Sequence, residues 1–126
     1  MPVNPYDSYK TVDKASLSGR ELEAAVLTEA ALKLKSVQDN WNAPDRKETL
    51  DAALKYNQLL WSIFQGELMD KNNPLPKKLR EDLLSLSAFV DKRIFEVMSY
   101  PSAEKLSILI DINKNIAAGL RTNTFK

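Results

Sequence analysis

The chain has 126 residues, of which 44% are hydrophobic, which is enough for one domain with a single hydrophobic core. Its 18 lysines and arginines are balanced by 17 aspartates and glutamates, so the basic excess of a dedicated nucleic-acid binder is missing. The absence of cysteine and histidine excludes disulfides and zinc sites of the usual Cys/His type.

Residues 1–17 are predicted to form a short N-terminal arm, which carries Tyr6 and Tyr9 in a polar setting. Tyrosines three positions apart lie on one face of a helical turn. We expect them to fasten the arm to the body of the protein, and the alternative is that they form part of a partner-binding surface.

The first predicted helix begins at Ser18, because Ser18 and Glu21 have the spacing of a capping box. Apolar residues recur along it at three- and four-residue steps, and the pattern fades near Asp39. Its apolar side is rich in alanine, which permits a neighbouring helix to approach closely. Trp41 follows in a loop that Pro44 closes.

The second predicted helix begins near Asp45, whose carboxylate can cap it, and a firm break follows at Asn72-Asn73-Pro74. Gly66 either ends this helix or weakens its last turn. Residues 53–64 are its most strongly apolar part, with large side chains at helical spacing. The core candidates in this stretch are Leu54, Leu60, Trp61 and Phe64.

The third predicted helix begins around Pro76, which suits a first helical position, and Tyr100-Pro101 ends it. Two basic groups lie on it: Lys77, Lys78 and Arg80, then Lys92 and Arg93. Such groups are able to contact RNA, but a solvated face with i,i+4 partners such as Lys78 and Asp82 is the favoured interpretation.

The fourth predicted helix begins near Ser102, and Gly119 is placed to end it in the left-handed conformation. Leu120 would then make the hydrophobic contact of a Schellman motif, before a C-terminal tail at residues 121–126. Short links between four helices imply antiparallel neighbours. We therefore predict an all-α, single-domain four-helix bundle over residues 18–120.

Two asparagines lie inside the apolar stripes, Asn57 on the second helix and Asn113 on the fourth. A buried amide without a partner costs roughly 1–3 kcal/mol, so each of them needs a hydrogen bond. We expect a structural polar network that fixes the register of the helices. The alternative is that one amide faces a groove and binds the backbone of a bound peptide.

Catalytic, cofactor-binding and metal-binding residues are not expected. No histidine is present as a base and no cysteine as a nucleophile, and no glycine-rich phosphate loop or calcium-loop pattern occurs. Carboxylate pairs such as Glu21/Glu23 are interpreted as solvated charges that favour the helix macrodipole. We therefore predict that the chain is not an enzyme and that it acts by binding another molecule.

Aromatic residues are the candidates for that binding. Trp41 in its loop and Tyr100 at the third break are predicted to be exposed anchors for a partner. Trp61 and Phe64 belong either to the core or to an open hydrophobic groove that holds a partner helix.

We expect a cytoplasmic protein without membrane association. The first residues have neither the basic nor the apolar region of a signal peptide. No apolar run approaches the roughly 20 residues that a membrane-spanning helix needs.

The stretch Ala53-Leu-Lys-Tyr-Asn-Gln-Leu-Leu-Trp-Ser-Ile-Phe64 resembles the FlaF family of alphaproteobacterial flagellar biosynthesis regulators. The likeness covers nearly the whole chain. It includes Tyr6, Tyr9, Arg20-Glu-Leu-Glu-Ala24, Asn73-Pro-Leu-Pro76, Leu83-Leu-Ser-Leu-Ser-Ala-Phe-Val90, Leu109-Ile-Asp-Ile-Asn113 and Ala118-Gly-Leu120.

The resemblance implies a cytoplasmic protein that is needed for flagellin synthesis and filament assembly. It implies a role in the control of flagellin synthesis, in opposition to the regulator FlbT, and in handling flagellin before export. Our first hypothesis is a flagellin chaperone or export adaptor that holds a flagellin segment in an apolar groove. The alternative is a post-transcriptional regulator of flagellin messenger RNA that acts with or against FlbT. Direct contact with the RNA is not expected.

Overall fold

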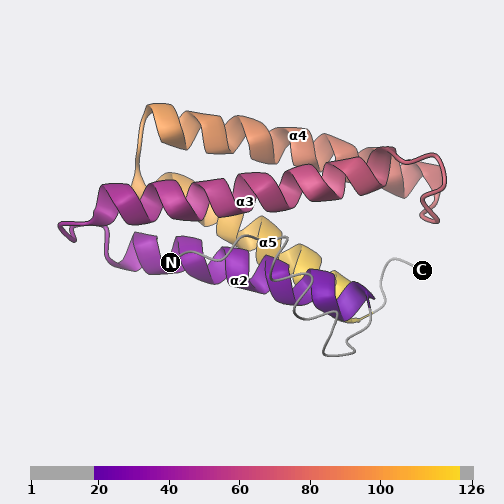
Figure 1. The fold of residues 1–126 in the computed structure, drawn as a ribbon, viewed down its shortest axis with the longest axis horizontal. Coiled ribbons are helices and arrows are strands. Elements are labelled where there is room, and N and C mark those ends of the chain that lie inside the picture. Colours follow the sequence, from indigo (N-terminus) through magenta and orange to yellow (C-terminus); the bar gives the residue numbers. More distant parts are fainter. Residues whose placement is uncertain (1–18, 123–126) are drawn as a thin grey trace.

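The computed structural model describes residues 19–122, and within this range the regular structure is all helical, with short connections and no strand. The elements are α2 (Gly19–Asp39), α3 (Arg46–Met69), α4 (Lys77–Ser99), the short 3-10 helix η1 (Ala103–Lys105) and α5 (Leu106–Arg121). Successive helices run in opposite directions (Figure 1). This confirms the predicted all-α class and the four-helix bundle.

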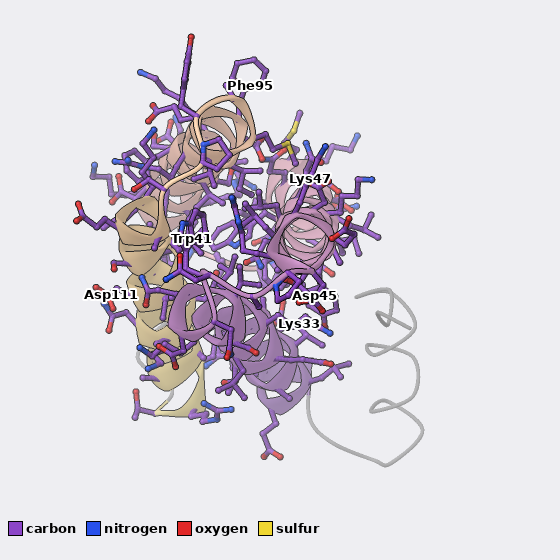
Figure 2. All side chains as sticks on the ribbon, turned by 90° about the vertical axis from the view of Figure 1, so that its left-hand side faces the viewer. Lys33, Trp41, Asp45, Lys47, Phe95 and Asp111 are labelled. Atoms are coloured by element: carbon purple, nitrogen blue, oxygen red, sulfur yellow. The ribbon has the colours of Figure 1, made fainter. Side chains whose placement is uncertain are left out.

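Helix α2 is central to the packing, because it contacts both α5 and α3, and its pairing with α5 is the most extensive in the bundle. The alanines of α2 explain this closeness, since Ala24, Ala30 and Ala31 are completely buried. Helix α4 packs mainly on α3 and touches α5 only slightly. Seen from one end, the four helices surround a shared interior that side chains fill (Figure 2).

Polar side chains join α2 to the C-terminal part of the chain at both ends. The Gln38 amide donates to the Ala103 carbonyl and to the Ser107 hydroxyl, both at 2.9 Å. At the other end the Arg121 guanidinium donates to the Thr28 hydroxyl at 2.9 Å. The α2–α5 pair is thus fixed in register at both ends.

The second predicted helix does supply the centre of the core. Its four candidates are all buried, with exposed fractions of 0% for Leu54, 2% for Leu60, 2% for Trp61 and 8% for Phe64. The rings of Trp61 and Phe64 meet edge to face, with centroids 5.7 Å apart and planes at 85°.

Two details of the predicted helix ends are wrong, namely the Asp45 side-chain cap and Pro76 as a first helical residue. Of the two alternatives for Gly66, the structure excludes the one in which it ends the helix. Asp45 precedes α3 but makes no side-chain capping bond, and the helix starts instead with the Thr49 N–H donating to the Asp45 carbonyl at 3.0 Å. Gly66 lies inside α3, which continues to Met69. Pro76 is the residue before α4, because its ψ of 143° is extended rather than helical.

The predicted left-handed cap at Gly119 is also wrong. Helix α5 continues through Gly119 and Leu120 to Arg121, and Thr122 closes it with a φ of −95°. The bond from Arg121 to Thr28 on α2 gives this last turn a partner outside its own helix, so the helix does not need to end at the glycine. Ser18 of the predicted capping box lies outside the described residues.

Candidate functional site

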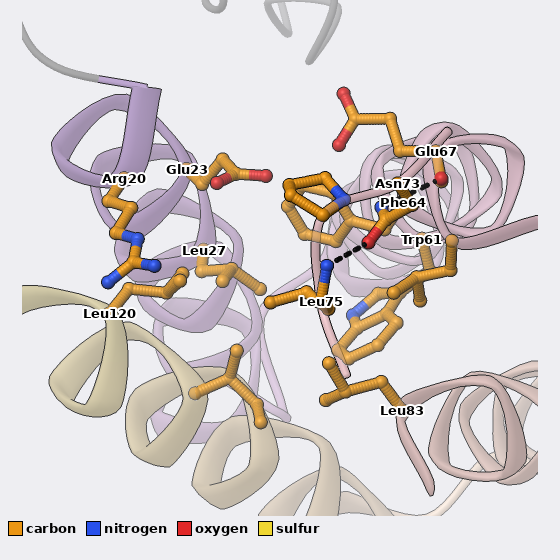
Figure 3. A pocket seen from close by; sticks show the side chains of 13 residues that line it. Arg20, Glu23, Leu27, Trp61, Phe64, Glu67, Asn73, Leu75, Leu83 and Leu120 are labelled. Atoms are coloured by element: carbon orange, nitrogen blue, oxygen red, sulfur yellow. Dashed lines mark hydrogen bonds between the residues drawn. The ribbon is translucent and has the colours of Figure 1, made fainter. Parts of the chain in front are cut away.

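An open cavity of about 260 Å³ lies at the end of the bundle where α2 begins and α5 ends. All four helices and the α3–α4 connection line it (Figure 3). Its wall is mainly apolar and includes Leu27 of α2, Trp61 and Phe64 of α3, Leu83 of α4 and Ile116 of α5. Trp61 and Phe64 are buried, as the core interpretation predicted, and they also line the cavity.

The α3–α4 connection forms one wall of this cavity, and Asn73 sets its shape. The Asn73 amide donates to the Glu67 backbone carbonyl at 2.9 Å, and its side-chain oxygen accepts the Leu75 N–H at 3.0 Å (Figure 3). These bonds replace the helical pattern with a fixed turn. Pro74 and Leu75 are thereby held against the cavity, which gives a physical reason for the Asn-Pro-Leu-Pro sequence.

Two carboxyl groups, Glu23 of α2 and Glu67 of α3, lie at the rim of the cavity. Burial, and after it the charge of Glu67, raises the pKa of Glu23 to about 7, while the Arg20 guanidinium acts in the opposite direction. Burial also raises the pKa of Glu67, against the effect of its hydrogen bond with Glu23. The pair therefore shares a proton near neutral pH.

The interpretation of Glu23 as a solvated helix-start charge is wrong. The side chain is partly buried and its carboxyl group points toward the cavity (Figure 3). A signal was present in the sequence, because Glu23 is four residues before Leu27 and so shares its helix face. Glu21, by contrast, is exposed.

Asn57 and Asn113 are joined in one buried hydrogen-bond chain. The Trp61 indole N–H donates to the Asn113 oxygen at 2.9 Å, and the Asn113 amide donates to the Asn57 oxygen at 2.6 Å. The Asn57 amide then donates to the carbonyls of Ala53 at 2.9 Å and Ala30 at 3.3 Å. The chain links α3, α5 and α2, and both asparagines are only 1% exposed.

The predicted partner-binding aromatics lie away from the cavity or outside the described range. Tyr6 and Tyr9 are outside the described residues. Trp41 and Tyr100 lie in connections at the opposite end of the bundle. Trp41 is not freely exposed as predicted, because it packs against the core and lies under the Arg46 guanidinium, 4.3 Å from its ring centroid. Tyr100 is 75% exposed.

Three of the five basic residues of α4 have acidic or backbone partners. Lys78 pairs with Asp82 at 2.9 Å, as the sequence predicted, and Arg93 lies 3.6 Å from Glu96. Arg80 donates to a backbone carbonyl in the α3–α4 connection at 3.5 Å. These cations lie in two separate turns of the helix rather than in one continuous patch.

Residues 19–122 contain no group of three or more side chains able to hold a metal ion, and no helix in this range is long and apolar enough to cross a membrane. A family model described as "Flagellar protein FlaF" matches residues 6–120. Searches of curated proteins and of solved structures gave no match.

Proposed function

The chain belongs to the FlaF family of flagellar proteins, and from this we propose that it acts in flagellum biogenesis as a cytoplasmic, non-enzymatic chaperone or export adaptor for flagellin. The direct partner in this proposal is flagellin, and a FlbT-type regulator is a second possible partner.

The observation that carries the proposal is the open apolar cavity. Trp61 and Phe64 are buried, at 2% and 8% exposed, and they form part of the wall of this cavity, which opens to solvent. Concave apolar sites with a few polar groups at the rim are typical binding sites. A segment of an unfolded partner would bury apolar side chains there and would be kept from premature assembly.

Binding is favoured over catalysis because the chain contains no histidine or cysteine. The Glu23–Glu67 pair is able to hold a proton, but none of the described residues that line the cavity is a serine, threonine, tyrosine or lysine that could react beside it. We therefore interpret the pair as part of a binding surface.

The alternative, direct regulation of flagellin messenger RNA, has weaker support. Among the basic residues proposed for it, Lys78 and Arg93 already lie beside carboxylates. RNA binding by the remaining cations would weaken steeply as salt is raised. Protein binding in an apolar cavity would not, so a salt series separates the two functions.

The proposal is tested by calorimetric titration with monomeric flagellin from the same bacterium. We compare the wild type with Leu75→Glu, which puts a charge in the cavity wall, and with Leu32→Glu, a change at a 58% exposed position on α2 that does not line the cavity. Loss of binding in Leu75→Glu alone is expected. Failure of the wild type to bind flagellin would refute the proposed function.

A further inference from the structure

We propose that the cavity recognises a segment in which a large apolar side chain stands next to a lysine or arginine. The apolar side chain enters the cavity, and the cation lies between Glu23 and Glu67 at the rim. This inference rests on the proposed function, because it takes the same cavity as the binding site. It adds the chemistry by which a partner segment would be selected.

The size and lining of the cavity fit one large apolar side chain. An apolar protein cavity of about 150 Å³ accommodates benzene, and this one measures about 260 Å³. The indole N–H of Trp61 is already bonded to Asn113, so its ring requires no acceptor from an occupant. Leucine, methionine and phenylalanine side chains meet these conditions.

The charges at the rim favour a cation. Among the described residues 19–122 that line the cavity, Arg20, Glu23 and Glu67 are the charged ones, and with both carboxyls ionised they supply one positive and two negative charges. Helix α4 contributes Leu83 to the lining, and α5 contributes Ile116 and Leu120. All three side chains are apolar. A lysine or arginine would supply the missing positive charge.

The proton shared by the carboxyls points to the same ligand. Two carboxylates held close together in a partly desolvated place do not ionise readily together. In the free protein burial, and after it the charge of Glu67, raises the pKa of Glu23 to about 7, and a bound proton relieves both the desolvation and the repulsion. A bound cation would do the same and would displace that proton, whereas a neutral or acidic neighbour would not.

The experiment uses three synthetic peptides of equal length with blocked ends and the same leucines. The residue beside each leucine is lysine in the first, glutamine in the second and glutamate in the third. Calorimetry at about pH 8 measures each against the full-length chain. We expect the lysine peptide to bind roughly tenfold more tightly than the glutamine peptide, and the glutamate peptide to bind least, because a hydrogen bond to a charged group is roughly twice as strong as one between neutral groups.

Two variants test whether the carboxyl groups at the rim cause the preference for the lysine peptide. In Glu23→Gln/Glu67→Gln the lysine and glutamine peptides should bind equally well. The matched control Asp111→Asn, at an exposed position on α5 that points away from the bundle (Figure 2), should keep the wild-type preference. Equal binding of the two peptides to the wild type, a preference that survives in the double variant, or no binding of the lysine peptide would each overturn the inference.

A pH series tests the displaced proton. With a pKa of about 7, the ionised fraction of Glu23 rises strongly between pH 6 and pH 8. The affinity of the lysine peptide should therefore increase up to about tenfold over that range, with proton release on binding, and that of the glutamine peptide should not. A pH-independent affinity of the lysine peptide would contradict the inference.

The two proposals fail separately. If flagellin binds and is lost with Leu75→Glu but not with Glu23→Gln/Glu67→Gln, the proposed function stands and the cation inference is refuted. If the peptides show the predicted preference but flagellin does not bind, the recognition chemistry stands and the assignment of flagellin is refuted.

Discussion

Replacing Glu23 with glutamine should make the bundle more stable at alkaline pH and leave it unchanged in acid. The pKa of Glu23 is raised from 4.5 to about 7 in the folded protein. Between these values the folded state binds more protons than the unfolded chain, so the free energy of unfolding falls as pH rises through this range. Glutamine is neutral at every pH, so the free energy of unfolding of the variant does not fall in this way.

The size of the effect follows from the pKa difference between 4.5 and about 7. At about 1.4 kcal/mol for each pH unit, the difference corresponds to about 3 kcal/mol as an upper bound. Glu23 is only partly buried, and solvent screening at the rim reduces the expected gain to about 1–2 kcal/mol.

The assay is urea unfolding followed by far-UV circular dichroism, repeated from about pH 5 to about pH 8. The difference between Glu23→Gln and wild type should grow with pH, and Asp111→Asn should follow the wild type throughout. A difference that is constant with pH, or that is largest in acid, would show that the rim pair does not hold the proton assigned to it.

Two further predictions concern the core. Asn57→Leu should lower the free energy of unfolding by about 1–3 kcal/mol, because the buried Asn113 amide loses its acceptor. If this variant instead keeps its stability and loses flagellin, Asn57 contacts the partner rather than the bundle. Trp61→Ala should cost about 3–5 kcal/mol, measured by the same unfolding assay, since it removes a fully buried ring. A cost below about 1 kcal/mol would show that the ring adds little to the core.

The sequence predicts the helices well because apolar spacing reports directly which face of a helix is buried. The same logic placed Asn57 and Asn113 on inward faces, and the structure brings them together. It did not identify the other members of their hydrogen-bond chain, the Trp61 indole and the Ala30 carbonyl. Those partners depend on the relative register of three helices, which no local pattern encodes.

The helix ends and the cavity were harder to predict for the same reason. Gly119 is a good cap locally, yet Arg121 finds a partner on α2 and the helix continues. Glu23 lies near the start of α2 beside the charged Arg20 and Glu21, but Glu67 and the α3–α4 connection come close to it only in the folded bundle. The polar group of greatest interest was therefore interpreted as an ordinary surface charge.

Hydrogen exchange on binding monomeric flagellin tests most directly whether the end cavity is the binding surface. We expect added protection in the α3–α4 connection around Leu75, in the first turns of α2 and in the last turn of α5, which surround the cavity. The connections at the opposite end, which contain Trp41 and Tyr100, should be unchanged. Protection confined to that opposite end, or to the exposed face of α4 around Phe95, would contradict it.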